Sequence, residues 1–347
     1  MMKNKNLEGV PDTMIIVTGG AGFIGSNLVA GLEEAGCRDI VICDAMGEDD
    51  KWRNILKHEI RDIVHPNNIF VFLDEYADDI EMIFHLGAIS DTTETDTDLV
   101  MHNNFSLSRE LWRWCYEHKV RFLYASSYST YGDGQSEVGF SDDDSPEMLA
   151  KLRPLNPYGW SKHLFDRRVS RIVHGQDVVN EGIPPQWVGL KFFNAYGPNE
   201  YHKGEHMSVV SKIYPQVIAG AAARLFKSNN PKYQDGDQVR DFIWIGDCVD
   251  VMLWFYKNPD KSGLFNLGTG EGRTFREMAE AMFAAAGKPA KITYTDMPEG
   301  LRDRYQYFTK ADIGKLRKAG YMKDFTSLED GLKLYIEKYL SQADRYR

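Results

Sequence analysis

Tyr158 and Lys162 are two residues that could transfer protons if they lie together on a helix. A spacing of four places both side chains on one helical face, so the lysine ammonium can lie beside the phenol. An isolated tyrosine has a pKa of about 10 and is a poor base at neutral pH. A fixed cation stabilises the phenolate and lowers the tyrosine pKa toward the working range. Upstream, Ser126 and Ser127 end an apolar run, where a hydroxyl could hold a substrate oxygen against Tyr158.

A glycine-rich segment from Gly19 to Gly25 (Gly-Gly-Ala-Gly-Phe-Ile-Gly) directly follows the apolar run 14–18. Glycines at positions 19, 22 and 25 permit a tight turn, close approach of the backbone to a pyrophosphate and close packing of the following helix. The N-terminus of that helix then points free amide groups at the phosphates. Asp44 stands 19 positions after Gly25, where a carboxylate can bind an adenosine ribose. The segment therefore predicts a dinucleotide-binding turn.

The residues alone leave the choice between two nicotinamide dinucleotides open. Asp44 favours NAD, because a carboxylate repels the 2′-phosphate of NADP. Lys51 and Arg53 follow at the start of the next predicted helix, where either could neutralise that phosphate. These charges therefore do not decide between NAD and NADP.

Length, charge and cysteine content exclude several classes of protein. The 347 residues carry a net charge of −10, and the acidic residues are scattered, so the surface would repel a nucleic acid backbone. The four cysteines form no CxxC pair, which predicts a reducing compartment and no metal site. The sequence shows neither a signal peptide nor a run of about 18 apolar residues. We expect a cytoplasmic protein with no nucleic acid or membrane partner.

Short apolar runs alternate with segments of helical periodicity in the first half of the chain. This order predicts an α/β fold, a Rossmann-like doubly wound parallel sheet with helices on both faces. The predicted strands are Met14–Thr18, Ile40–Cys43, Ile69–Leu73, Met82–Leu86, Phe122–Ala125 and Trp187–Phe193. The predicted helices between them are Phe23–Ala35, Trp52–Val64, Ser106–His118 and Tyr158–His174.

After Asn194 the regular alternation fades, which indicates a smaller, mixed α/β substrate lobe beside the large one. We expect the cofactor to bind the large lobe and the substrate to bind the smaller one. The predicted divisions are an N-terminal extension at 1–13, a dinucleotide-binding domain at 14–193 with returning segments near 241–270 and 327–347, and a substrate-binding lobe at 194–240 and 271–326.

Over most of its length the chain resembles the extended short-chain dehydrogenases/reductases, the NAD-dependent epimerase/dehydratase superfamily that acts on nucleotide sugars. The motifs that carry the resemblance are Gly19–Gly25, His85-Leu-Gly-Ala88, Ser126-Ser127, Tyr158-x-x-x-Lys162 and Phe193-Asn-Ala-Tyr-Gly-Pro198. The resemblance implies that Tyr158 is the acid/base, that Lys162 binds the nicotinamide ribose and lowers the tyrosine pKa, and that Ser127 is the hydroxyl partner. The cofactor contacts that it implies are Gly19, Gly22, Phe23, Ile24, Gly25, Asp44, Lys51, Leu86, Gly87, Ala88, Ser90, Asn103, Tyr158, Lys162, Ala195 and Lys203.

Further motifs are similar to those of the ADP-L-glycero-D-manno-heptose 6-epimerase family, which makes the heptose donor for the lipopolysaccharide core. They are Ser90-Asp-Thr-Thr-Glu94, Asn103-Asn104, His202-Lys-Gly204, Arg240-Asp-Phe242, Phe265–Gly270, Arg304–Asp312 and Leu316–Tyr321. That family commonly holds NADP through an acidic residue, a neighbouring Asn and a Lys seven positions on. Asp44 and Lys51 match, and Ala45 replaces the Asn. The resemblance implies NADP, with NAD as the alternative, and a homo-oligomer, reportedly a homopentamer.

The reaction that the resemblance implies is a redox-neutral epimerisation of ADP-D-glycero-D-manno-heptose at C-6″. The C-6″ hydroxyl loses its proton while the C-6″ hydride passes to the nicotinamide, and the transient carbonyl takes the hydride back on its other face. Opposite faces require proton transfer from opposite sides, so a second acid/base is needed besides Tyr158. The resemblance gives this role to Lys203, which can serve if burial and nearby positive charge lower its pKa.

The diphosphate of an ADP-sugar requires cations in a chain of negative net charge. Arg240, just before an apolar run, is the strongest candidate. In the region of Lys212 the residue types differ from the family, which often has His at that position. The predicted substrate contacts are Asn194, Glu205, Ser208, Lys212, Phe226, Arg240 and Tyr305.

Two other functions remain as alternatives. One is a different nucleotide-sugar enzyme, such as a UDP-hexose 4-epimerase. A 4,6-dehydratase fits less well, because Tyr128-Ser129 stand where such enzymes carry Asp-Glu. The other is a catalytically silent cofactor-binding regulator or scaffold. Such proteins typically lose the tyrosine or the lysine, and both Tyr158 and Lys162 are present.

Overall fold

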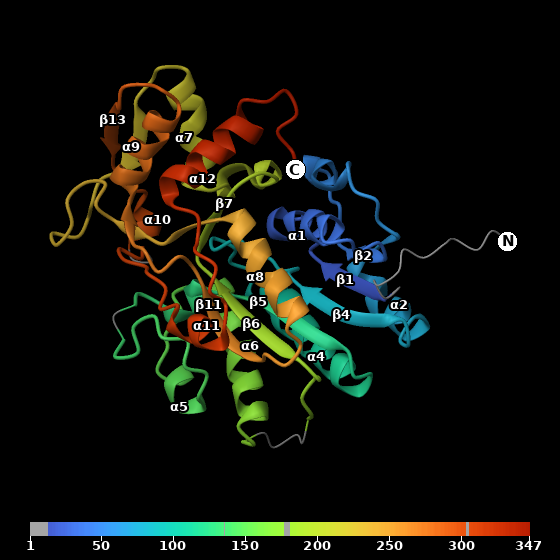
Figure 1. The fold of residues 1–347 in the computed structure, drawn as a ribbon. Helices are drawn as coiled ribbons and strands as arrows, with labels where there is room; N and C mark the ends of the chain where they lie inside the picture. The colour runs from blue at the N-terminus through green and yellow to red at the C-terminus, as the bar shows by residue number, and fades with distance from the viewer. Residues whose placement is uncertain (1–12, 135, 177–180, 303–304) are drawn as a thin grey trace.

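Seven parallel strands form the central sheet, in the spatial order β3-β2-β1-β4-β5-β6-β11 (Figure 1). The computed structural model describes residues 13–134, 136–176, 181–302 and 305–347, so the predicted extension, apart from Thr13, and Arg304 lie outside the described residues. The strand order reverses beside β1, and ligands of such sheets bind at the carboxyl ends of the strands there. The sheet strands are β1 Met14–Thr18, β2 Ile40–Cys43, β3 Asp62–Val64, β4 Ile80–His85, β5 Arg121–Ser127, β6 Trp187–Phe192 and β11 Gly263–Leu267.

Helices cover both faces of this sheet, which explains why its central strands are apolar on both sides. α1 and α8 pack together on the face that carries Ile15 and Val17, while α2, α4 and α6 pack on the face that carries Met14 and Ile16. The predicted doubly wound α/β fold is therefore confirmed. The bounds of these helices are α1 Phe23–Glu34, α2 Ile69–Glu75, α4 Leu107–Glu117, α6 Pro157–Val173 and α8 Ile245–Lys257.

Two of the predicted elements are wrong. The predicted strand Ile69–Leu73 is the first part of α2, because Pro66 starts a helical turn just before it and its apolar ends, four positions apart, bury one helical face. The predicted helix Trp52–Val64 is a 3-10 helix at Asp50–Ile55 followed by the edge strand β3. Few side chains of this segment are buried, so it lacks the continuous apolar face that stabilises an α-helix in a protein.

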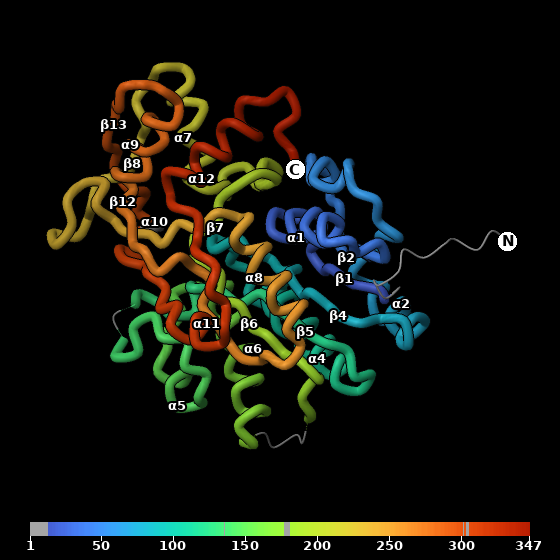
Figure 2. Tube along the Cα trace, viewed as in Figure 1, coloured from blue at the N-terminus to red at the C-terminus, as the bar shows by residue number. Residues whose placement is uncertain are grey.

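A smaller hydrophobic core lies between α7, α9 and α12, and Figure 2 shows these three helices side by side, away from the sheet. The two-stranded pair β8–β13 flanks it. We predicted that residues 327–347 return to the large lobe. The apolar face of α12 packs on α9, and near the chain end Arg347 pairs with Glu34 of α1 at 2.9 Å. The bounds here are α7 Val209–Ile218, β8 Ala223–Phe226, α9 Phe275–Ala285, β13 Ile292–Thr295 and α12 Leu328–Tyr335.

Short elements join the two lobes. β7 follows β6 directly and pairs in parallel with β10, which leads into α8, so the chain leaves the sheet and returns to it at adjacent points. No helix among the described residues is long and apolar enough to cross a lipid bilayer. The remaining bounds are α3 Thr97–Met101, α5 Pro146–Leu149, β7 Asn194–Tyr196, β9 Val239–Arg240, β10 Phe242–Trp244, β12 Arg273–Thr274, α10 Glu299–Arg302 and α11 Gly314–Ala319.

Candidate active site

The glycine turn between β1 and α1 has the backbone geometry of a phosphate-binding site. Gly19 adopts a positive φ of 67°, and its N–H donates to the Cys43 carbonyl at 2.8 Å. A Cβ on Gly25 would lie 2.1 Å from the Gly19 carbonyl oxygen, so only glycine permits this approach of the helix to the turn. Gly22 precedes α1 without a side-chain cap. The first amides of α1, from Phe23 onward, therefore remain without a capping side chain and fit a pyrophosphate.

Asp44, at the end of β2, lies against this turn with a cation beside it. One carboxylate oxygen accepts the Ala21 N–H at 2.9 Å, and the other pairs with Lys51 Nζ at 2.7 Å. Arg53, the other basic candidate, instead pairs with Asp50 at 3.1 Å on the surface. Of the two cations, it is Lys51 that the structure places next to the predicted ribose ligand.

The proton-transfer pair lies at the start of α6, where Asn156 caps the helix by accepting the Gly159 N–H at 2.8 Å. Burial raises the pKa of Tyr158 to about 12, although a hydrogen bond with Ser127 opposes this shift. Burial lowers the pKa of Lys162 to about 8. We expected the lysine to lower the tyrosine pKa, but the largest cause acting on Tyr158 is burial, which raises its pKa.

A buried ion pair lies directly beneath this pair of residues. Asp166, one turn beyond Lys162 on α6, is 2.8 Å from Lys191 Nζ on β6, and neither side chain has any exposed surface. Ser126 Oγ donates to Asp166 at 2.7 Å, and the Lys191 ammonium donates to Thr130 Oγ1 at 2.5 Å. The charge of Asp166 raises the pKa of Lys162, in opposition to burial. The network fixes the serine strand end and α6 against each other.

Lys203 lies in the 3-10 helix Tyr201–His206, which follows β7. Its ammonium is 5.3 Å from the centre of the Phe23 ring, so the structure places this lysine at the glycine turn, as a cofactor contact requires. Burial lowers the pKa of Lys203, Glu200 raises it and Lys212 lowers it further. Burial thus shifts the pKa of Lys203 in the direction that the predicted base role requires, and the role itself stays a prediction.

Arg240 provides a buried cation at the other end of the site. Its guanidinium lies 5.0 Å from the ring centre of Tyr305 and 5.4 Å from that of Phe275, and it donates to the Val239 carbonyl at 2.8 Å. Among the described residues no carboxylate lies within ion-pair distance of it. A buried cation without a carboxylate is costly unless an anion binds there, so the role of Arg240 toward the diphosphate stays a prediction.

Tyr128 is a residue of this site that the sequence analysis did not name as a contact. It stacks on Phe193 with ring centres 5.5 Å apart, and its hydroxyl accepts from Asn194 Nδ2 at 3.4 Å. A charge on Tyr128 would raise the pKa of both Tyr158 and Tyr305. Its position immediately after the serine pair was the available signal.

The other predicted substrate contacts lie in different surroundings. Glu205 is almost fully exposed and lies 3.6 Å from Lys212, so these two residues are together. Ser208 caps α7 and donates to the buried Glu200 carboxylate at 2.7 Å, which gives this serine an architectural part. Phe226, on β8, is 37% exposed. Their roles toward a substrate remain predictions.

Most residues of this site lie in a range that matches a known protein family. Residues 15–268 match the NAD dependent epimerase/dehydratase family, a range that includes the glycine turn, the Tyr158–Lys162 pair, Lys203 and Arg240. The chain belongs to this family. The predicted class, an NAD(P)-dependent nucleotide-sugar epimerase that uses a nicotinamide cofactor, is thereby confirmed.

Within the family, the chain is 46% identical over 96% of its length to ADP-L-glycero-D-manno-heptose-6-epimerase of Fusobacterium nucleatum, which is covered completely. It is 47% identical over 95% of its length to the Nitratidesulfovibrio vulgaris enzyme of the same name, covered to 99%. The crystal structure of the Helicobacter pylori enzyme of that name is 27% identical, with a TM-score of 0.71 over 94% of this chain and 96% of that one. The crystal structure of a Thermus thermophilus UDP-glucose 4-epimerase with NAD is 25% identical, with a TM-score of 0.72 over 94% of this chain and 98% of that one. Sequence identity, rather than shape, therefore groups this chain with the heptose epimerases.

The loop after β4 packs against the glycine turn between β1 and α1. Gly87 donates its N–H to Thr18 Oγ1 at 3.1 Å, which brings the predicted contacts 86–90 against the glycine turn. Asn104, in a π-helical turn, binds both the N–H and the carbonyl of Ile89, at 2.8 and 2.9 Å. Asn103, the predicted contact, bonds its own helix at Leu99 instead. Asn104, rather than Asn103, therefore holds the loop after β4 in place. Ala195 lies on β7, which pairs with β10.

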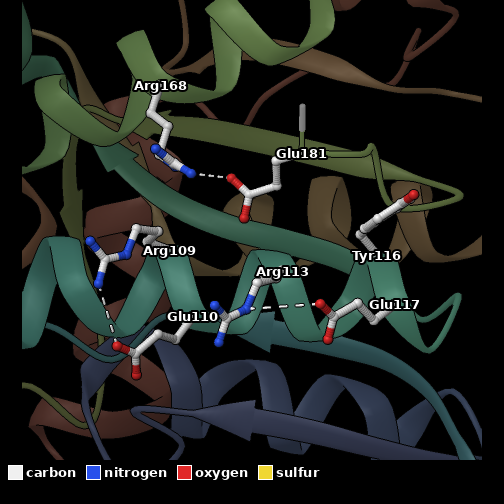
Figure 3. A pocket seen from close by; sticks show the side chains of 7 residues that line it. All are labelled: Arg109, Glu110, Arg113, Tyr116, Glu117, Arg168 and Glu181. Carbon is white, nitrogen blue, oxygen red and sulfur yellow. Dashed lines mark hydrogen bonds and ion pairs between the residues drawn. The ribbon is translucent and has the colours of Figure 1, made fainter. Parts of the chain in front are cut away.

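A cavity of about 450 Å³ lies elsewhere on this epimerase-family chain, over α4 and α6 (Figure 3). Its charged side chains are paired with one another: Figure 3 shows links from arginine to glutamate in three places. The compensated charges leave no net attraction for an anionic ligand, so we place no part of the reaction here. The lining residues are Arg109, Glu110, Arg113, Tyr116, Glu117, Arg168 and Glu181.

Proposed function

We propose that the chain epimerises ADP-D-glycero-D-manno-heptose at C-6″ to the L-glycero form, a step in making the lipopolysaccharide core. The observation that carries this proposal is that the chain holds both a buried phenol, Tyr158, hydrogen-bonded with Ser127, and a buried guanidinium, Arg240, that pairs with no carboxylate among the described residues. The names of the relatives at 46–47% identity support the heptose as substrate. By the same family resemblance we propose that copies of the chain form a homo-oligomer.

The nicotinamide cofactor supplies, when bound, the ability to accept a hydride from the sugar and to return it. The chain's own residues supply binding and proton transfer. The glycine turn and the first turn of α1 hold phosphates, and Lys162 is placed to hold a ribose beside Tyr158. Arg240 holds the diphosphate of the substrate, so that the sugar extends toward the phenol.

Two residues with opposite pKa shifts divide the proton transfer. The raised pKa of Tyr158, about 12, keeps its phenol protonated at neutral pH, so this residue gives a proton to the sugar oxygen. Burial lowers the pKa of Lys203, and this lysine takes the proton of the sugar hydroxyl. Environments that shift two groups in opposite directions are typical of an acid and a base at one site.

A direct test of the substrate is a comparison of two nucleotide sugars with the purified protein. We expect ADP-D-glycero-D-manno-heptose to be converted to a mixture of the two C-6″ epimers, separated by chromatography and identified by proton NMR. UDP-glucose should remain unchanged. Formation of UDP-galactose without heptose conversion would favour the 4-epimerase alternative and reject the proposal.

Arg240→Ala should raise the apparent KM for the ADP-sugar by about tenfold to a hundredfold, because hydrogen bonds to charged groups contribute about 1.5–3 kcal/mol. The kcat should change much less, since the diphosphate is held equally before and during the reaction. Steady-state kinetics measure both constants. Arg113→Ala is the matched control, because it removes the same charge from the outer surface of α4. An unchanged KM would show that another residue holds the diphosphate.

We propose NADP rather than NAD as the cofactor, since Lys51 is available beside Asp44. The nucleotide released by denaturing the purified protein should therefore carry a 2′-phosphate, which mass spectrometry detects. Lys51→Ala should weaken NADP binding by about tenfold, as expected for one charge-assisted contact, and leave NAD binding unchanged. Arg53→Ala, which removes a surface partner of Asp50, should weaken neither. Release of NAD from the unaltered protein would contradict this proposal.

A further inference from the structure

Asp241 is a carboxylate without exposed surface that directly follows Arg240. Its Oδ1 accepts the backbone N–H and the hydroxyl of Thr269, both at 2.7 Å. Its Oδ2 accepts the Gly270 N–H at 2.9 Å and the Ala311 N–H at 3.0 Å. Because three of these four donors are backbone groups, the carboxylate fixes the chain at two places that are distant in sequence.

The first of these places leads to one of the two aromatic rings beside the arginine. The loop 269–270 leads into β12, which pairs antiparallel with β9, the strand of Arg240. Phe275 directly follows β12, and its N–H donates to the Gln238 carbonyl at 3.1 Å. The ring centre of Phe275 is 5.4 Å from the guanidinium. By binding this loop, Asp241 holds the segment that brings Phe275 to the arginine.

The segment that Asp241 binds at Ala311 carries the second ring. Before Ala311 this segment runs alongside β9, and backbone hydrogen bonds of 2.9 and 3.2 Å join it to the N–H and the carbonyl of Val239. Tyr305 lies at the start of this stretch, and its ring centre is 5.0 Å from the Arg240 guanidinium. The same carboxylate therefore also holds the segment that brings Tyr305 to the arginine.

We propose that Asp241 is a positioning residue for Arg240, which holds the guanidinium and the two rings beside it in place. It acts through the backbone, because its carboxylate oxygens bind the donors of the two segments. The proposal rests on the proposed function, in which Arg240 binds the diphosphate of the ADP-sugar. Substitution of Asp241 should loosen the packing around Arg240, and it should weaken diphosphate binding only through that residue.

The first test measures the packing around Arg240 without any substrate. The purified enzyme, with its bound nucleotide, is treated with phenylglyoxal, which modifies guanidinium groups, and mass spectrometry of peptides follows Arg240 over time. Asp241→Asn replaces one acceptor oxygen by an NH₂ donor, so hydrogen bonds to the carboxylate are lost. Arg240 is only 6% exposed. It should be modified about tenfold faster in the variant, because the lost hydrogen bonds make local opening of this site easier.

Asp247→Asn is the matched control for this test. Asp247 is also buried and also accepts the N–H and the hydroxyl of one threonine, Thr326, at 2.8 and 3.0 Å, but it lies on α8. Its substitution should destabilise the fold in a similar way and leave the modification rate of Arg240 unchanged. An equal gain in both variants, or no gain in Asp241→Asn, would overturn the proposal.

Calorimetric titration with ADP tests whether the effect on affinity passes through Arg240. Asp241→Asn should weaken ADP binding by about threefold to tenfold, within the range of coupling between neighbouring residues. In the Arg240→Ala background the same substitution should change the affinity by less than about twofold, the margin for sites that do not interact. A full effect of Asp241→Asn in that background would overturn the proposal, since it would show a general structural role.

The variant Arg240→Ala by itself separates this inference from the proposed function. If this variant binds ADP as tightly as the unaltered protein, the diphosphate role of Arg240 fails. Faster modification of Arg240 in Asp241→Asn than in Asp247→Asn would then still support Asp241 as its positioning residue.

Thr269→Val provides a milder change should Asp241→Asn fold poorly. It removes the hydroxyl that donates to Asp241 and keeps the carboxylate with its three backbone donors. The modification rate of Arg240 should rise by a smaller factor than in Asp241→Asn. A rate equal to that of the unaltered enzyme would overturn the proposal.

Discussion

Tyr158→Phe should lower kcat for epimerisation by about 10²–10⁴-fold, the range contributed by a well-placed general acid or base. The substitution removes only the hydroxyl, whose contact in the structure is with Ser127. Burial keeps this phenol protonated, so its loss removes the group that gives a proton to the sugar oxygen. The rate of formation of the second epimer, followed by chromatography, measures the effect.

The bound nucleotide content should be the same in Tyr158→Phe and in the unaltered protein, because the glycine turn and Lys51 are not changed. Tyr116→Phe is the matched control: it removes a hydroxyl from an exposed tyrosine on α4 and should keep full activity. Epimerisation by Tyr158→Phe at a rate near that of the control would end the assignment of this tyrosine as the acid.

Asp166→Asn should lower the free energy of unfolding by about 3–5 kcal/mol, the usual cost of leaving one partner of a buried ion pair uncompensated. The Lys191 ammonium, without exposed surface, would keep only its contact with Thr130 and the face of the Tyr131 ring. The substitution should also lower the pKa of Lys162 below about 8, because the charge of Asp166 raises it. Chemical denaturation followed by fluorescence measures the first effect.

The double variant Asp166→Leu with Lys191→Met distinguishes the cost of an unpaired charge from a general need for this pair. Replacement of a buried ion pair by apolar side chains of similar volume is often neutral or stabilising. We therefore expect the double variant to be more stable than Asp166→Asn. A double variant less stable than the single one would show that the pair itself, and not the stranded charge, holds α6 against the sheet.

Most strands of the central sheet were predictable because they are buried on both faces and separated by helices of clear periodicity. β3 was missed, because two of its three residues are exposed. The alternation from Met14 to Phe193 carries that information. The second half was not readable in the same detail, because β7, β9, β10 and β12 have only two or three residues each. So short a strand has no period to detect, and the pairing partner of each lies far along the chain.

For the site, residue spacing predicted the pairing of Tyr158 with Lys162 and the turn before α1, since both depend on local backbone geometry. The direction of the tyrosine pKa shift was wrong, because its largest cause is burial, which is a property of the folded molecule. Asp166 carried a signal that was not used. It stands four positions after Lys162, and Lys191 interrupts an otherwise apolar strand, so each buried charge required a partner.

The most direct measurement of the central claim is the fate of the hydrogen at C-6″ of the sugar. ADP-D-glycero-D-manno-heptose with deuterium at C-6″ is incubated with the unaltered protein in ordinary water, and both epimers are examined by NMR. We predict that both keep the deuterium, because the hydrogen leaves and returns as a hydride without reaching water. Protium at C-6″ of the product epimer would contradict this, since it would show that the carbon is deprotonated and reprotonated from solvent.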